Sequence, residues 1–196
     1  MPEKIAVPAV REKTQLVLAS GSPRRAELLR RAGFEFTVCS SQVEEPPYSG
    51  GDPVEYAIAL AQAKAAAVEG ELVMGADTIV VLDHQVLGKP ANSEQAIQML
   101  RSLSGRSHRV ITAVAVRRSR EMRCDYAQST VHFRRLKEVE IQSYVSSGEP
   151  LDKAGAYAIQ GQAAAFVERL EGERDTVIGL PMNLLDRLLT SLRIKR

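Results

Sequence analysis

Several signatures of common protein classes are missing from this 196-residue sequence. It contains no tryptophan and only two cysteines, Cys39 and Cys124, which form no CxxC motif and have no histidine pair beside them. This excludes a disulfide framework and a thiolate zinc site, and it favours a reducing, cytoplasmic location. No apolar run comes near the roughly 20 residues that cross a bilayer, so we expect no transmembrane helix and no membrane partner.

A strong charge of one sign is also missing. The 26 basic residues are balanced by 24 acidic ones, which leaves a net charge of +2. Such a balance gives no general attraction for nucleic acid, so we expect no nucleic-acid partner, and any phosphate binding must be local. The sequence also lacks the glycine-rich phosphate loop of common nucleoside triphosphatases, the GxGxxG dinucleotide fingerprint and the GxSxG motif of serine hydrolases.

What remains is the composition of an ordinary globular protein, with 44% apolar and 26% charged residues. Residues 1–14 mix charged residues with two prolines and lack the apolar core of a signal peptide. We expect this segment to be a flexible N-terminal tail. Residues 15–196 are long enough to form a single domain with a buried core.

Helical and extended patterns alternate along the chain. Helices are predicted over residues 23–32, 53–69, 93–105, 137–147 and 181–192. Strands are predicted over residues 15–20, 34–39, 72–82, 86–87, 109–116, 124–133, 156–160 and 164–170, with the third one broken at residues 75–78. Because hairpin-like pairs interrupt the strand-helix alternation, the pattern favours a mixed-sheet α/β fold, with a cleft between two lobes.

The turn Ser20-Gly-Ser-Pro-Arg24-Arg25 is the first candidate binding site. Two arginines in the first turn of a helix face the positive end of its dipole, which costs roughly 0.3 to 1 kcal/mol each. A bound polyphosphate would relieve this repulsion, because free backbone N–H groups, the Ser20 hydroxyl and two guanidinium groups suit phosphate oxygens. Alternatively, the two arginines pair with the nearby acids Glu27 or Glu44.

Asp77 is the second candidate, since it interrupts an apolar run where an unpaired charge would be expensive to bury. Taken alone, it is more often a residue of an exposed turn than a metal ligand or a base facing a cleft. Glu44 and Glu45 supply further carboxylates in a loop. A carboxylate set suits Mg²⁺ or Mn²⁺ better than zinc, although such acids are commonly just solvated.

Two lysines could add positive charge to the same region. Lys64 lies in an alanine-rich helix and Lys89 precedes a proline, but most lysines in such places are solvated. The three histidines show no ligand spacing, and we assign none of them to catalysis.

Five short fragments, in this order along the chain, contain most of these candidate residues. They are Leu18-Ala-Ser20-Gly-Ser-Pro-Arg24-Arg25, Gly75-Ala-Asp77-Thr78, Leu87-Gly-Lys89-Pro90, Leu151-Asp-Lys-Ala-Gly-Ala-Tyr157-Ala-Ile-Gln160-Gly and Gly179-Leu-Pro181. Together they resemble the Maf family of nucleoside triphosphate pyrophosphatases, and the resemblance spans residues 16 to about 189.

The resemblance implies an elongated α/β fold of the inosine-triphosphatase-like type, with two lobes around a central nucleotide cleft. It also implies a homodimer that requires a divalent cation, Mg²⁺ or Mn²⁺. The roles that carry over by motif are phosphate binding by Ser20, Arg24 and Arg25, a loop carboxylate at Glu45, cleft lysines at Lys64 and Lys89, and general-base catalysis by Asp77. Our hypothesis for the mechanism is that Glu45 and Asp77 hold the metal ion.

Within the family, Arg24, Thr78 and Gln160 resemble the branch that acts on dTTP and UTP. The Gln160 amide offers a donor and an acceptor together, which suits the imide and carbonyl edge of uracil or thymine. One departure is Gln162-Ala-Ala-Ala165, where relatives often have a glycine-rich turn.

The expected activity is therefore hydrolysis of dTTP or UTP to the nucleoside monophosphate and pyrophosphate, by metal-assisted attack of water. The alternatives are a pyrophosphatase for 7-methyl-GTP or modified nucleotides, and a non-enzymatic nucleotide-binding regulator of septum formation. A plain globular protein whose arginine turn makes surface salt bridges is a further alternative, which five ordered motifs disfavour.

Overall fold

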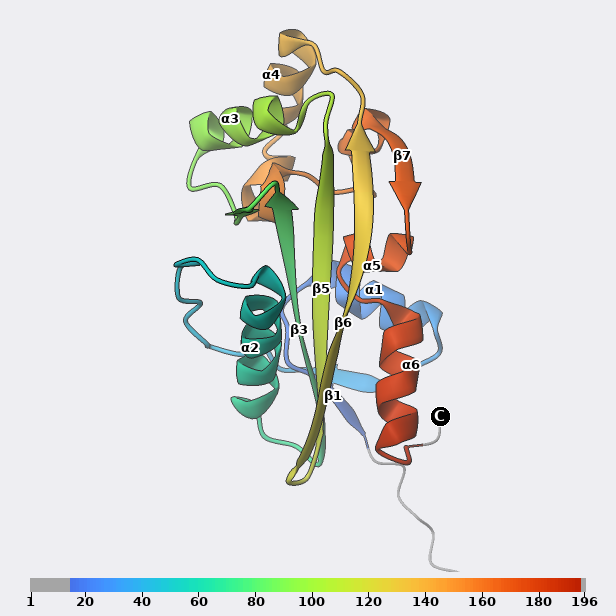
Figure 1. Ribbon diagram of the computed structural model, residues 1–196. Coiled ribbons are helices and arrows are strands. Elements are labelled where there is room, and N and C mark those ends of the chain that lie inside the picture. The colour runs from blue at the N-terminus through green and yellow to red at the C-terminus, as the bar shows by residue number, and fades with distance from the viewer. Residues whose placement is uncertain (1–14, 195–196) are drawn as a thin grey trace, which may run out of the picture.

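Three long strands, two of them rich in β-branched residues, run along the molecule (Figure 1). In this computed structural model, which describes residues 15–194, they are β3 (Leu72–Leu82), β5 (Ser107–Arg118) and β6 (Glu121–Phe133). β5 pairs antiparallel with both β3 and β6, as predicted for the second of these pairs. The predicted tail over residues 1–14 lies outside the described residues.

Shorter strands complete a seven-stranded mixed sheet in the order β2-β1-β3-β5-β6-β7, with β4 paired to β3. β1 runs parallel to β2 and β3, whereas the other pairs are antiparallel. The predicted mixed-sheet α/β class is therefore confirmed. These shorter strands are β1 (Leu16–Leu18), β2 (Phe36–Val38), β4 (Gln85–Leu87) and β7 (Val167–Glu171).

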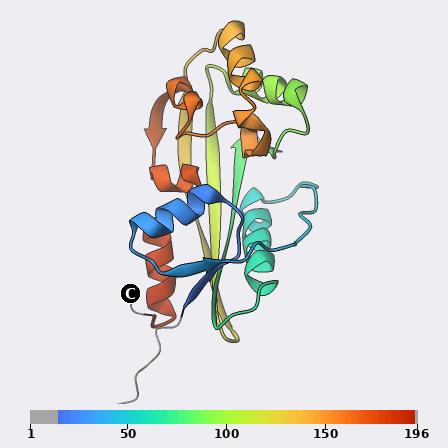
Figure 2. The ribbon, with the colours of Figure 1, turned by 180° about the vertical axis from the view of Figure 1, so that it is seen from behind.

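The helices gather at two ends of the sheet and form two lobes (Figures 1 and 2). The described helices are α1 (Pro23–Arg31), α2 (Pro53–Ala66), α3 (Ser93–Leu103), α4 (Glu138–Ser146), α5 (Arg174–Ile178) and α6 (Met182–Ser191). In Figure 1, α3, α4 and β7 lie around the upper half, and α1, α2 and α6 around the lower half. No helix within residues 15–194 is long and apolar enough to cross a membrane.

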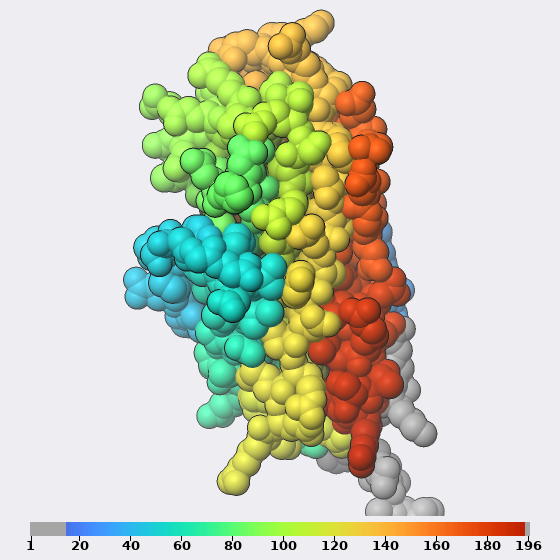
Figure 3. All heavy atoms as spheres, viewed as in Figure 1, coloured from blue at the N-terminus to red at the C-terminus, as the bar shows by residue number. Residues whose placement is uncertain are grey.

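Alternation along β5 sends its side chains to opposite faces of the sheet, each covered by different helices. Val114 and Val116 belong to a core with α1 and α6, whereas Ala113 and Ala115 pack against α2. The upper lobe has a core of its own between the ends of the long strands, α3 and α4. Figure 3 shows the lower part of β6 exposed between α2 and α6, in keeping with its partly exposed side chains.

The helix α2 lies unusually close to the sheet. It begins as the sequence predicts, with Pro53 in its first turn and the Asp52 carboxylate accepting a hydrogen bond from the Val54 N–H at 2.9 Å. A Cβ atom placed on Gly75 of β3 would lie only 2.4 Å from the carbonyl oxygen of Ala61. The absence of a side chain at Gly75 thus allows the backbone of α2 to touch β3.

The predicted break in the third strand is wrong. β3 continues through residues 75–78, and its ladder with β5 runs without interruption from the pair Leu72 and Arg118 to the pair Val81 and Arg109. Gly75 lies inside the strand, against the backbone of α2, and does not form a turn. Asp77 pairs in register with Ala113.

The strand predicted over residues 156–160 is also wrong. Gly155 and Ala156 both have positive φ angles, of 67° and 59°, so the chain turns where an extended strand was expected. The apolar side chains of Tyr157 and Ile159 are buried in the two cores, and this burial produced the strand-like pattern.

The segment around this turn is built from short 3₁₀ helices. They are η1 (Glu149–Asp152), η2 (Ala154–Ala156) and η3 (Gln162–Phe166). The next predicted strand, over residues 164–170, therefore begins only at Val167, and α5 was not predicted.

Replacing Gly75 with alanine should destabilise the protein by about 1–3 kcal/mol, because the new methyl group must push α2 off the sheet. The midpoint of urea unfolding, followed by circular dichroism, measures this effect. Gly88→Ala is the matched control, because a Cβ atom there meets nothing within 4 Å. Equal midpoints for the two variants would contradict the close packing of α2.

Candidate active site

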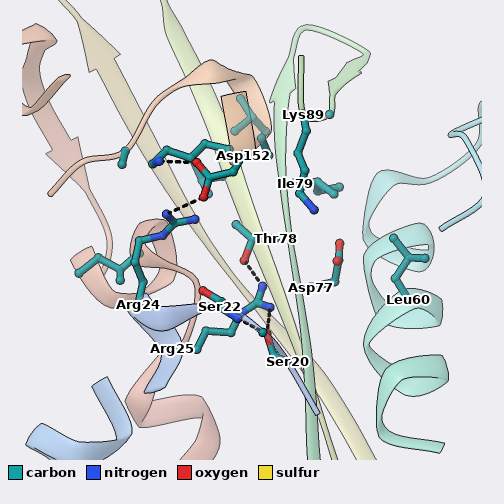
Figure 4. Close-up of a pocket in the computed structure, with 18 of the residues that line it drawn as sticks. Ser20, Ser22, Arg24, Arg25, Leu60, Asp77, Thr78, Ile79, Lys89 and Asp152 are labelled. Atoms are coloured by element: carbon teal, nitrogen blue, oxygen red, sulfur yellow. Dashed lines mark hydrogen bonds and ion pairs between the residues drawn. The ribbon is translucent and has the colours of Figure 1, made fainter. Parts of the chain in front are cut away.

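A pocket of about 440 Å³ lies where the two lobes meet. The structure brings all of the predicted site residues to its wall: Ser20, Arg24, Arg25, Glu45, Lys64, Asp77, Thr78, Lys89 and Gln160. They come from the turn before α1, the first turn of α1, the loop before α2, α2 itself, β3, the turn after β4 and the turn after η2. Figure 4 shows the centre of this pocket.

Arg25 is partly buried, and its guanidinium donates to uncharged oxygen atoms. Its Nε donates to the carbonyl of Gly179 at 2.8 Å, and its terminal nitrogens donate to Ser20 Oγ at 2.9 Å and Thr78 Oγ1 at 3.1 Å. Burial lowers the pKa of Arg25 from its ordinary value, although the nearby charge of Asp77 opposes this effect. Within residues 15–194 no carboxylate forms a salt bridge with Arg25, so its charge is not neutralised by direct pairing.

A chain of hydroxyl groups fixes the orientation of Thr78. Thr112 Oγ1 on β5 donates to the carbonyl of Thr176 at 2.7 Å, which uses its only hydrogen. It must therefore accept the hydrogen of Thr78, which lies 3.0 Å away, and this leaves the Thr78 oxygen free to accept from Arg25. No motif in the sequence points to Thr112, a fully buried hydroxyl in an apolar strand.

Arg24 reaches across the pocket to the other lobe. Its guanidinium lies 3.8 Å from the carboxylate of Asp152 in η1, and both side chains are partly exposed. The alternative pairing of the two arginines with Glu27 or Glu44 is wrong within the described structure, because Glu27 pairs with Arg30 and Arg31 on the outer face of α1.

Lys64 joins two acids at the opposite side of the pocket. Its Nζ lies 2.6 Å from Asp77 Oδ1 and 2.7 Å from Glu45 Oε1, and both Lys64 and Asp77 are buried. The exposed-turn interpretation of Asp77 and the solvated interpretation of Lys64 are thus both wrong. Burial alone would raise the pKa of Glu45, but the hydrogen bond and charge of Lys64, together with Lys89 and Arg25, hold it below its ordinary value.

The loop that carries Glu45 is tied to α2 by a residue that the sequence did not single out. The Tyr56 hydroxyl donates to the carbonyl of Pro46 at 2.7 Å, and Tyr56 itself lines the pocket. Asp152 and Lys153 also line the pocket. They belong to a fragment that carried the family resemblance, which was the only signal that could have found them.

The arrangement of carboxylates limits how a metal could bind. No group of three or more His, Cys, Asp or Glu residues in the described chain is placed to hold a metal ion. Glu45 and Asp77 do converge on one cation, the ammonium group of Lys64. Because Mg²⁺ commonly takes one or two carboxylates and completes its shell with water and substrate phosphates, this pair fits such an ion only together with a substrate.

Comparison with known proteins agrees with this geometry. The model of the Maf-like protein family matches residues 15–192. The chain belongs to the Maf family. It is 49% identical over 177 residues to the dTTP/UTP pyrophosphatase of Geobacter sulfurreducens, which covers 87% of this chain and 93% of that one. It is 44% identical over 184 residues to the dTTP/UTP pyrophosphatase of Bacillus cereus, which covers 92% and 96% of the two chains.

The fold of this Maf protein is similar to that of the Staphylococcus aureus Ham1 protein. The superposition has a TM-score of 0.51 at 17% sequence identity and covers 91% of this chain and 99% of the other. The expected inosine-triphosphatase-like fold is thereby confirmed.

Behind the pocket of the Maf protein lies a buried histidine. His108 Nε2 is 2.7 Å from the hydroxyl of Tyr157, a pocket residue, and its ring packs edge-on against Phe133. Burial lowers the pKa of His108 from 6.5 to about 4. His108 is therefore neutral at pH 7, and it anchors Tyr157 without placing a charge beside the pocket.

This burial predicts a loss of stability in mild acid. Unfolded chains take up a proton at the histidine below pH 6.5, whereas the folded state does so only near pH 4, so the free energy of unfolding must decrease as the pH falls between these values. Between pH 7 and pH 4.5 the contribution of His108 should be about 2 kcal/mol.

Urea unfolding at several pH values, compared between the native protein and His108→Gln, isolates this contribution. The variant should start less stable at pH 7 but lose less stability on acidification, because glutamine does not titrate. Parallel pH profiles for the two proteins would show that His108 is not buried in its neutral form.

Proposed function

We propose that this Maf protein hydrolyses the nucleoside triphosphates dTTP and UTP to the monophosphate and pyrophosphate. The observation that carries the proposal is the partly buried guanidinium of Arg25, which has only uncharged partners and opens onto a pocket at a helix start. Leaving a partly buried cation without a paired counter-charge is unfavourable, so an anion is the expected occupant. The relatives named dTTP/UTP pyrophosphatase support the choice of nucleotide.

The charges in the pocket suit a polyphosphate chain that must also meet a water molecule. Figure 4 shows Ser20, Arg24 and Arg25 to one side of Thr78, and Asp77 and Lys89 to the other. We assign phosphate binding to Ser20, Arg24 and Arg25 and charge neutralisation near the reacting phosphorus to Lys64 and Lys89. This division places cations around the phosphates and a carboxylate at their edge.

Asp77 is proposed as the general base. It accepts a proton from water as the water oxygen bonds to the α-phosphorus, and the bond from that phosphorus to the bridging β-phosphate oxygen breaks. Pyrophosphate leaves with the electron pair of the broken bond. Lys64 holds the Asp77 carboxylate in position from α2.

We propose that Glu45 and Asp77 hold Mg²⁺ or Mn²⁺ together with the substrate. When bound, such an ion neutralises charge on the phosphate oxygens and polarises the reacting phosphorus. The loop contact between Tyr56 and Pro46 fixes Glu45 at the correct side of the pocket for this role.

Gln160 is proposed to read the pyrimidine base. Its side chain is exposed on the pocket wall, and an amide matches both the donor and the acceptor of a uracil or thymine edge. We further propose that the protein works in the cytoplasm as a homodimer, with nucleotides as its partners. The two cysteines, which form no disulfide, suit a reducing compartment.

The first test measures pyrophosphate release by the purified protein from dTTP, UTP, CTP, GTP, 7-methyl-GTP and ATP, with and without Mg²⁺ or Mn²⁺. The highest kcat/KM should belong to dTTP and UTP, and activity should disappear in a chelator and return with added metal. A preference for 7-methyl-GTP would overturn the choice of nucleotide. Binding without any cleavage would favour a nucleotide-binding regulator.

Asp77→Asn tests the assignment of the base. The amide cannot take up the proton, so kcat should fall by at least about 100-fold, while nucleotide binding remains measurable by calorimetry. Glu44→Gln is the control, because Glu44 lies in the same loop region as Glu45 but outside the pocket wall. Retained turnover in Asp77→Asn would refute the role of Asp77.

A further inference from the structure

The side-chain amide of Gln160 is not held by a hydrogen bond to any described residue, and the side chain is exposed on the pocket wall. The position from which this amide can reach a base therefore depends on the backbone that carries it, over residues 157–162. A residue that fixes this backbone controls what Gln160 can contact.

The start of this segment is fixed from behind the pocket. Tyr157 is buried, and its hydroxyl is held by His108 at 2.7 Å. The carbonyl of Ile159 accepts a further hydrogen bond from Arg174 at 3.1 Å. These contacts place the residues before Gln160.

The end of the segment is fixed by Glu149, which does not line the pocket. Its Oε2 accepts a hydrogen bond from the backbone N–H of Gln162 at 3.3 Å, and its Oε1 accepts one from the hydroxyl of Tyr144 at 3.2 Å. Burial, followed by the charge of Glu149, raises the pKa of Tyr144, so its hydroxyl remains a donor at neutral pH.

The carboxylate of Glu149 also occupies the space beside Gly161. A Cβ atom built on Gly161 would lie 1.8 Å from Glu149 Oε1 and 2.5 Å from its carboxyl carbon. Only a glycine can therefore follow Gln160 while Glu149 holds this position. The two residues form one unit, with Glu149 held by Tyr144 and the turn held by Glu149.

We propose that Glu149 is a positioning residue for base selection, which fixes the turn at Gly161 and Gln162 so that the Gln160 amide faces the base of the bound nucleotide. This rests on the proposed role of Gln160 in the same pocket. Glu149 acts through the backbone and does not touch the nucleotide. Its removal should affect the choice between bases more than the reaction at the phosphate.

The test compares the binding of UMP and CMP by calorimetry, together with kcat/KM for UTP and CTP, in five variants. These are Glu149→Ala, Glu149→Gln, Gln160→Ala, the double variant of Glu149→Ala with Gln160→Ala, and the control Glu168→Ala, an exposed carboxylate of β7. Uracil and cytosine differ at the edge that an amide reads, so their ratio reports on Gln160.

The preference for uracil over cytosine should fall about tenfold in Glu149→Ala and in Gln160→Ala, since both remove an oriented hydrogen-bonding group. The double variant should be no less selective than Gln160→Ala alone, because Glu149 acts through Gln160. Glu168→Ala should keep the native ratio, and the kcat for UTP should change by less than about threefold in Glu149→Ala.

Glu149→Gln keeps the shape of the side chain and one acceptor oxygen, so it should fold normally and lose part of the selectivity. An unchanged ratio in both Glu149 variants, or an equal loss for both bases, would overturn the proposal. So would native protein that binds UMP and CMP equally. Native protein that selects UMP but cleaves no triphosphate would refute the proposed function and leave the role of Glu149 standing.

Discussion

The contact of the α2 backbone with β3 is the constraint on which the active site depends. It brings the Lys64 ammonium within hydrogen-bond distance of Asp77, on the face of the sheet that α2 covers. A buried ion pair of this kind adds little to stability, because removing both charges from water costs about as much as their attraction returns. The presence of this ion pair in a contact lined by alanines is better explained by a functional role of Asp77 than by a contribution to the stability of the fold.

The cationic side chains in the two halves of the pocket have different partners. Lys64 is matched by two carboxylates, whereas Arg25 is surrounded by two hydroxyls and a carbonyl. The hydroxyl chain through Thr78 and Thr112 keeps the Thr78 oxygen turned toward Arg25. The first half therefore balances its positive charge within the protein, whereas the second retains an attraction for an incoming anion.

Local sequence rules were sufficient for most helices and for the long hairpin. The Asp52 cap, Pro53 and the run of alanines predicted α2 correctly, and Gly33 and Gly105 marked helix ends. Local sequence rules failed where a contact between residues far apart in the sequence decides the conformation. Gly75 suggests a break in isolation, but the approach of α2 makes it part of a continuous strand.

In the candidate site, too, local patterns and long-range contacts differ in what they predict. The ordered fragments contain seven of the nine predicted residues, all but Glu45 and Lys64, and all nine line one pocket. Residue types alone were misleading, since an aspartate in an apolar run and a lysine in a helix are usually solvated. Thr112 and Glu149 could not be predicted, because they act through other residues and carry no motif of their own.

The unbroken ladder of β3, β5 and β6 has a mechanical consequence. The three strands extend into both lobes, so a hinge between the lobes would have to break the hydrogen bonds between them (Figure 1). The frame of the pocket is accordingly stiff. Any adjustment to the size of an occupant falls to the rim of the pocket outside the sheet, chiefly to the part of the loop between β2 and α2 that lies away from the contact of Tyr56 with Pro46, which can change shape without bending the sheet.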